Sequence, residues 1–382
     1  MIVMSLLLTA CWDRTEVNDV AFVMGSAVDK EGDQIRATIQ IALPGQLGGS
    51  RGGGGGTSGN KNWYLLSKTA DTIRQANHEQ QSSVSRRLNF SHRRTLLIGE
   101  EMAREGIEPI IDVLARIPQN RLTAFVLITK GSAAKVLAAR TPAEQFPAEA
   151  LRELAAGSMK VPRTLSLVIN AMLSEGIDLA IPAAFVDPTV TTEGDNLKDT
   201  IKVEGLAVFK QNKLADFLEK EEAIGVLLAM GEAQTPEVTV KAPEGEGKIV
   251  AQFLRYDTVL DPVIRGDKIT FRILIDATGT VLENESNFQL SQHAQIEMLE
   301  ESLEHKVKAD VENGIRKLQQ LESDAVGFGK TIYSKKPEDW RRLKENWYEH
   351  FTRIHVEVIP VLNIENIGSI IKPFGRKEQH LE

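Results

Sequence analysis

The sequence predicts an α+β fold built from three mixed α/β domains. Three observations carry this prediction. Apolar and polar residues alternate in runs bounded by turn residues, which indicates strands. A stripe of apolar residues at spacings of three and four covers 291–323, which indicates one long helix. Two changes of composition, an acidic polar stretch at 189–199 and a loop-rich connector at 231–247, separate the parts of this 382-residue chain.

These boundaries divide the chain into a short leader, three folded parts and a tail. The predicted segments are a signal peptide at 1–10, an N-terminal α/β domain at 11–190 with a Gly-rich loop at 45–60, a middle hairpin–helix segment at 200–247, a C-terminal α+β domain at 248–370, and a polar tail at 371–382.

The leader ends in Leu8-Thr9-Ala10-Cys11, the order of a bacterial lipobox, and Cys11 is the only cysteine. In that pattern the thiol receives a diacylglyceryl group and the mature chain begins at the cysteine. The alternative is a buried N-terminal strand, but charged residues follow Cys11 at once, as after a signal sequence. No Lys or Arg precedes Cys11, which predicts that the true start lies upstream. Cys11 is therefore the predicted lipid attachment site.

The N-terminal domain begins with a predicted hairpin at 20–43 and continues into a loop in which nine of sixteen residues are glycine. Two formal patterns in this loop, a nucleophile elbow at 48–52 and a dinucleotide fingerprint at 54–59, lack the flanking strand and helix that their chemistry needs. Strands and helices then alternate, which favours some parallel pairing. The expected elements are a helix at 63–84, a strand at 94–98, helices at 100–116 broken at Pro109, a strand at 123–129, a helix at 132–139 capped by Ser132, a helix at 163–173, and a strand or connection at 177–186.

The middle segment predicts a hairpin at 203–218 and a helix at 219–230. The last domain predicts strands at 249–256 and 269–276, the long helix at 291–323, a shorter helix at 339–353 and a strand at 354–361. Strands on both sides of two helices predict an antiparallel sheet with the long and the shorter helix packed on one face. One face of the shorter helix, rich in aromatic residues, is expected to be core rather than a ligand cage; it carries Trp340, Leu343, Trp347 and Phe351.

No catalytic, cofactor-binding or metal-binding residues are predicted. The segment 324–331 resembles a phosphate-binding loop, but Asp324 stands where the first glycine belongs and a helix precedes it, so it indicates a glycine turn. The seven histidines include no pair at i,i+4. The net charge of −8 argues against nucleic acid as a partner. Apart from Cys11, chemistry-bearing residues are scattered.

Several landmarks in order resemble one family, the Ger(x)C lipoproteins, which are the C subunits of the nutrient germinant receptors of endospore-forming bacteria. The likeness runs from Cys11 to about Gly368. Its landmarks are Cys11-Trp12-Asp13 with Glu16 and Asn18, Gly25 and Asp29-Lys30 before Gln40-Ile41 and Pro44, Glu204 to Phe209 with Lys213-Leu214, Asp276 with Gly279, the turn from Asp324 to Gly329, and Trp340 with Trp347.

The resemblance implies a non-catalytic lipoprotein that is required for nutrient-triggered spore germination. It implies anchoring through acylated Cys11 to the outer surface of the spore inner membrane, beside integral membrane A and B subunits. It assigns no contact with the germinant. Two alternatives are an extracytoplasmic solute-binding lipoprotein, which needs two lobes around a cleft, and a membrane-tethered hydrolase, which needs a convergent nucleophile and base.

Overall fold

The computed structural model describes residues 19–43, 62–117, 119–139, 141, 144–188, 199–266 and 268–367. Contacts divide the chain into two compact units. The N-terminal unit holds 1–153, 164–166 and 184–202, and the C-terminal unit holds 154–163, 167–183 and 203–382. Contacts thus group 203–247 with the C-terminal sheet, while the division into 11–190, 200–247 and 248–370 stays a prediction.

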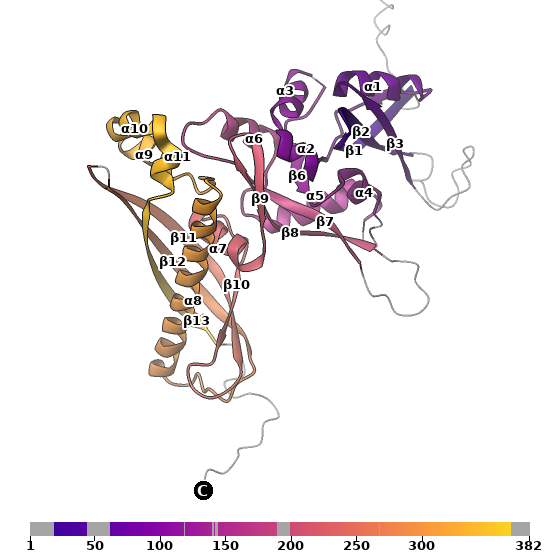
Figure 1. The fold of residues 1–382 in the computed structure, drawn as a ribbon. Coiled ribbons are helices and arrows are strands. Elements are labelled where there is room, and N and C mark those ends of the chain that lie inside the picture. The colour runs from indigo at the N-terminus through magenta and orange to yellow at the C-terminus, as the bar shows by residue number, and fades with distance from the viewer. Residues whose placement is uncertain are drawn as a thin grey trace, which may run out of the picture. The chain divides into compact units, whose positions relative to one another are not determined.

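The N-terminal unit is built on a sheet in which a predicted hairpin meets two parallel strands (Figure 1). The turn at Gly32, which has φ +62°, lets β1 fold back on β2, and β3 extends the antiparallel pairing. β5 pairs in parallel with β1 and with β6, as the alternation of strands and helices predicted. The strands are β1 (Val20–Glu31), β2 (Gln34–Ala42), β3 (Trp63–Ala70), β4 (Arg87–Asn89), β5 (Thr95–Gly99) and β6 (Phe125–Thr129).

The helix predicted at 63–84 is wrong in its first half. Residues Trp63 to Ala70 form β3, which pairs with β2 from Ala42 to Ile35. The helix starts only after Thr72, whose hydroxyl accepts a hydrogen bond from the N–H of Gln75. Cross-strand pairing therefore overrides the helical spacing of apolar residues in this stretch. The resulting helix is α1 (Ile73–Ser82).

The helices predicted at 100–116, 132–139 and 163–173 are found close to their expected positions, and a further helix at 147–158 was not among the predicted elements. The break within 100–116 falls at Gly106, which has φ +137°, and Pro109 lies in the first turn of the next helix, where its missing N–H costs nothing. The helices are α2 (Glu100–Glu105), α3 (Glu108–Arg116), α4 (Ala133–Ala138), α5 (Pro147–Ser158) and α6 (Leu165–Met172), and β7 (Ala180–Pro188) follows them. The unit boundary falls within α5, α6 and β7, and again within the strand at 199–210.

The C-terminal unit contains a four-stranded sheet of order β10-β11-β12-β13 with α8 lying along it (Figure 1). The predicted hairpin at 203–218 and the helix after it are confirmed as β8, β9 and α7. The elements are β8 (Asp199–Lys210), β9 (Lys213–Leu218), α7 (Lys220–Met230), β10 (Glu237–Lys241), β11 (Lys248–Arg265), β12 (Lys268–Asn284), α8 (His293–Gln320), α9 (Phe328–Lys335), α10 (Pro337–Leu343), α11 (Trp347–Phe351) and β13 (His355–Asn366).

One detail of the predicted antiparallel sheet needs correction. β10, β11 and β12 are antiparallel, but β13 joins β12 in parallel, with His355 opposite Thr270. The reason is the connection: α8 returns along the sheet, so the chain re-enters at the end where β12 began. The single helix predicted at 339–353 is also split, into α10, a 3₁₀ turn at Lys344–Asn346, and α11.

The apolar stripe of α8 forms the centre of this unit's core, as predicted. Its members are fully or almost fully buried: Leu299, Leu303, Val307, Val311, Ile315 and Leu318. On the α7 side the two helices approach so closely that only glycine fits. A Cβ on Gly225 of α7 would lie 2.0 Å from the carbonyl oxygen of Asp310, and one on Gly314 of α8 would lie 2.8 Å from that of Glu222.

Candidate functional site

The predicted lipid attachment site, Cys11, lies outside the described residues, as does the loop at 45–60. Within the described ranges, no helix combines the length and apolar character needed to cross a membrane. In the same ranges no three His, Cys, Asp or Glu side chains gather in a way that would hold a metal ion. The polar groups that the fold does bring together are centred on buried aspartates.

The segment that resembles a phosphate-binding loop carries its own hydrogen-bond acceptor, the side chain of Asp324. Asp324 is 1% exposed. Its Oδ1 accepts hydrogen bonds from the N–H groups of Gly327 and Phe328 at 2.9 and 2.8 Å, and its Oδ2 accepts one from Gly329 at 2.8 Å. The indole N–H of Trp347 also donates to Oδ2, at 3.0 Å. The amides that a phosphate would need are therefore used by this side chain, as expected from Asp324 in the sequence.

A second buried aspartate braces the same turn. Asp178 accepts the N–H of Asp324 at 2.8 Å, the N–H of Gln211 at 2.8 Å and the hydroxyl of Tyr348 at 2.9 Å. Burial raises the pKa of Asp178, and it raises that of Asp324 to about 8, while the N–H donors around each carboxyl oppose the shift. The pair joins the chain before β7, the β8–β9 turn, the turn before α9, and α11.

The aromatic residues beside this turn are core, as predicted. Trp340 and Trp347 are 4% and 6% exposed, and their rings meet edge to face with centroids 5.2 Å apart. Phe328 stacks on Phe271 of β12 at 4.2 Å. The indole N–H of Trp340 donates to Glu175 at 2.7 Å. Each polar edge has a partner and each face is packed, which leaves no room for a ligand cage.

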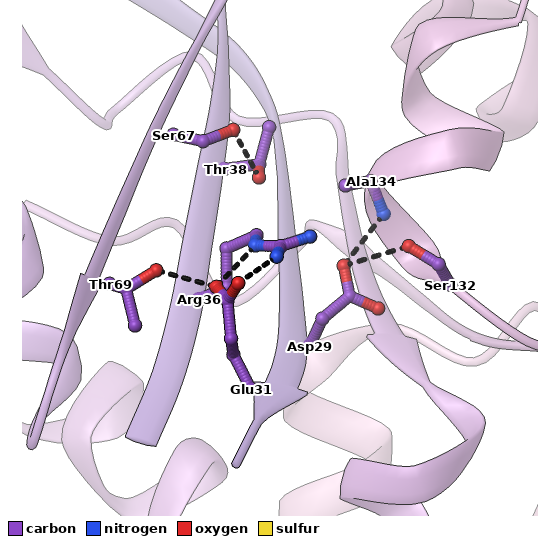
Figure 2. A network of polar contacts seen from close by, with 8 residues as sticks. All are labelled: Asp29, Glu31, Arg36, Thr38, Ser67, Thr69, Ser132 and Ala134. Atoms are coloured by element: carbon purple, nitrogen blue, oxygen red, sulfur yellow. Dashed lines mark hydrogen bonds and ion pairs between the residues drawn. The ribbon is translucent and has the colours of Figure 1, made fainter.

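In the N-terminal unit, Asp29 at the end of β1 caps α4 (Figure 2). Its carboxylate accepts the N–H groups of Ala133 and Ala134 at 2.7 and 2.9 Å and the hydroxyl of Ser132 at 3.3 Å. Ser132 occupies the predicted N-cap position, but its side chain makes no capping bond. The predicted cap by Ser132 is therefore wrong, because the carboxylate of a neighbouring strand accepts hydrogen bonds from the helix N-terminus better than the local hydroxyl does.

A second polar group in Figure 2 ties the first three strands together at one end. Glu31 of β1 accepts hydrogen bonds from Arg36 of β2 and from the hydroxyl of Thr69 of β3, at 2.6 and 2.7 Å. The Arg36 hydrogen bond is the main reason that the pKa of Glu31 falls to about 2. Because this pKa is lower in the folded chain than in the unfolded one, Glu31 contributes stability above about pH 4.5 and loses it as the pH falls towards 2.

We expect the melting temperature of the Glu31→Gln variant to fall less than that of the wild-type chain between about pH 4.5 and 2. Circular dichroism melts across that window measure it. Glu101→Gln is the matched control, since Glu101 is exposed and should leave the profile unchanged. Identical profiles for wild type and Glu31→Gln would contradict the assignment.

The N-terminal unit contains a basic pocket that the sequence patterns above do not predict. Two cavities of about 260 and 540 Å³ share Arg93 in their linings. The signal was present in the chain, because no Asp or Glu occurs between Glu79 and Glu100 while four arginines do. Helical and strand spacing carries no information about which arginines meet in space, so the pocket becomes evident only in the folded chain.

The fold and these sites define a mixed α/β protein whose buried acids fix turns and helix ends within each unit. The chain belongs to the GerAC-like spore germination proteins. The family model described as the spore germination protein N-terminal domain matches residues 13–185, and that described as spore germination B3/GerAC-like, C-terminal, matches 204–368. The resemblance to the Ger(x)C family is thereby confirmed, and with it a role in spore germination.

Relatives from Bacillus subtilis (strain 168) match over nearly their whole length. The putative spore germination protein YfkR is 39% identical over 96% of this chain and 95% of its own. Spore germination protein KC is 26% identical over 96% and 94%, and spore germination protein B3 is 26% identical over 97% and 98%. The crystal structure of the GerBC protein has the same fold, with a TM-score of 0.56 at 20% identity over 90% of this chain and 97% of that one.

Proposed function

We propose that this protein is a non-catalytic, lipid-anchored subunit of a nutrient germinant receptor. It is held by acylated Cys11 at the outer surface of the spore inner membrane and assembles with the integral membrane A and B subunits. One observation carries the proposal: the lipobox 8–11 ends two residues before residue 13, where the first of two matches to the germination family begins; these matches cover 13–185 and 204–368.

The physical basis of the anchor is the number of acyl chains. Each buried CH₂ contributes about 0.8 kcal/mol, so one chain holds a protein only marginally, whereas the two chains of a diacylglyceryl group hold it stably. An anchored chain needs no membrane-spanning helix of its own. The charged residues after Cys11 then begin the part of the chain that lies outside the membrane.

The test of the anchor is the Cys11→Ala variant, expressed from the native locus in its spore-forming host. We expect the wild-type chain to begin at Cys11, to carry a diacylglyceryl mass by intact mass spectrometry, and to sediment with spore membranes. Cys11→Ala should lose both the lipid mass and the membrane fraction. Ser5→Ala, a substitution of similar size three residues before the lipobox, should leave both unchanged. An unmodified wild-type chain in the soluble fraction would contradict the anchor.

Assembly is tested separately by affinity purification of the wild-type chain from detergent-solubilised spore membranes. The two integral membrane subunits are expected to co-purify in fixed proportion. Germination in response to nutrients should fall strongly in Cys11→Ala spores and stay normal in Ser5→Ala spores. A wild-type chain that carries lipid but purifies alone would overturn the receptor assignment and leave the anchor standing.

A further inference from the structure

The segment between α1 and β5 is strongly basic in an acidic chain. It contains Arg86, Arg87, Arg93 and Arg94, and no acidic residue lies between Glu79 and Glu100, although the net charge of the whole chain is −8. Like charges so close together repel one another. Their concentration in one place therefore points to a function that uses positive charge.

Backbone hydrogen bonds fix the two central arginines. The side chain of Asn89 accepts hydrogen bonds from the N–H and hydroxyl of Ser91, which forms a tight turn. The N–H of Arg93 donates to the carbonyl of Phe90 at 3.2 Å, and the N–H of Arg94 donates to the carbonyl of Met24 on β1 at 2.6 Å. Arg93 and Arg94 thus start from a firmly held backbone beside the sheet.

Arg93 is a buried cation. It is 6% exposed, and its Nε has no hydrogen-bond partner in the described part of the chain. Its guanidinium lies over the ring of Phe90, 5.0 Å from the centroid. Burial lowers the pKa of Arg93 to about 10, so the group is still charged at neutral pH. A buried charge is normally paired, because desolvation is costly and a ring face replaces little of the lost hydration.

Three further arginines surround the same space. Arg93, Arg94, Arg121 and Arg152 line the cavity of about 260 Å³, together with the hydroxyl-bearing Ser91 and Thr123, and its lining includes no acidic residue. Two carboxylates pair with these arginines: Glu149 contacts Arg94 and Arg152, at 3.4 and 2.8 Å, and Glu153 also pairs with Arg152. Two carboxylates against four guanidinium groups leave the cluster with a surplus of positive charge.

We propose that this pocket binds a small oxyanion, a carboxylate or a phosphate group, with Arg93 as its central partner and Arg94, Arg121 and Arg152 around it. Guanidinium groups bind such anions through two parallel N–H···O bonds, and the geometry suits planar carboxylates and tetrahedral phosphates alike. The volume fits the anion with a small organic body. Structural roles, over the ring of Phe90 for Arg93 and in ion pairs for Arg94 and Arg152, do not explain the surplus of positive charge in this lining.

The experiment is isothermal titration of the purified full-length chain with inorganic phosphate and, separately, with sodium acetate, at ionic strength held constant with sodium chloride. The chain carries Cys11→Ala so that no lipid contributes. We expect saturable binding of at least one of the two anions. Arg93→Gln should weaken it by about tenfold or more, and Arg121→Gln, at an exposed position where misfolding is not expected, by about threefold to tenfold. Arg116→Gln on the exposed face of α3 is the matched control and should bind as the parent does.

A stability measurement separates binding from a structural role. Because Arg93 is a buried charge, Arg93→Gln is expected to melt at or above the temperature of the parent in chloride buffer and to lose the rise in melting temperature that the anion gives the parent. A strong loss of stability in Arg93→Gln, together with no anion-dependent rise in the parent, would show that Arg93 is only a packing residue.

Vesicles identify the source of the anion. Binding of free phosphate or acetate, with equal recovery on phosphatidic acid and phosphatidylcholine vesicles, indicates a free small molecule. Arg93-dependent binding to phosphatidic acid vesicles indicates a lipid headgroup, which presents the same chemistry. If neither phosphate, acetate nor either kind of vesicle binds, the proposal is overturned. If only a polyglutamate peptide binds, the proposal is also overturned, and the pocket instead binds an acidic protein segment.

Discussion

Replacing Asp324 by alanine is expected to lower the free energy of unfolding by roughly 4 kcal/mol. The carboxylate accepts three backbone N–H groups, from Gly327, Phe328 and Gly329, and the indole N–H of Trp347. The site is almost completely buried, so water cannot replace the lost acceptor. Each N–H donor left without an acceptor costs about 1–3 kcal/mol, and the removal of a desolvated acid from the core offsets only part of this sum.

Urea denaturation of the full-length chain, followed by circular dichroism, measures the effect. Asp257→Ala is the matched control, because Asp257 is an exposed aspartate on β11 of the same unit, and it should change stability by no more than about 0.5 kcal/mol. Asp324→Asn should give an intermediate loss, since its amide keeps one acceptor oxygen but turns a donor towards the other N–H groups. Equal stability of Asp324→Ala and wild type would refute the view that this acid holds the turn.

Gly225→Ala is the second substitution for which we expect a large effect, a loss of about 3 kcal/mol or more. The added methyl would lie 2.0 Å from the carbonyl oxygen of Asp310 and 2.5 Å from its carbon, both backbone atoms of α8. Backbone cannot turn aside as a flexible side chain can, so α7 and α8 would have to separate. Since α8 carries the central apolar stripe, separation exposes core.

The same substitution at Gly157 provides the control with the opposite sign. Gly157 lies in α5, and a Cβ there would meet nothing within 4 Å. Alanine should therefore stabilise the chain by roughly 0.5–1 kcal/mol through its higher helix propensity. Urea midpoints of the two variants against wild type test the pair. A stabilising effect of alanine at both positions would show that local propensity, and not the close approach of α7 and α8, governs Gly225.

The family and much of the secondary structure could be predicted from local features of the sequence. Residue spacing alone predicts the apolar stripe of α8, the β8–β9 hairpin and the core position of Trp340 and Trp347. The order of the sequence landmarks predicted the family in the same way. The lipobox predicts a lipid anchor at Cys11, and the mass of the mature chain is the measurement that tests this prediction.

Long-range contacts decided the rest. β3 formed where spacing favoured a helix, because β2 offered an unpaired edge, and β13 took the parallel direction because α8 carries the chain back along the sheet. Asp29 replaced Ser132 as the cap of α4 from more than a hundred residues away. None of these partners is adjacent in sequence, so no local pattern encodes them.

The polar sites show the same division. Asp324 in the place of a glycine was enough to argue against a phosphate loop, but only the folded turn shows the carboxylate accepting the amides of Gly327 to Gly329. The arginine-rich stretch was visible in the sequence, yet Arg121 and Arg152 join Arg93 only through the sheet and α5. Sequence determined which charges and faces this protein has, and tertiary structure decided which of them meet, because burial and pairing are properties of the packed chain.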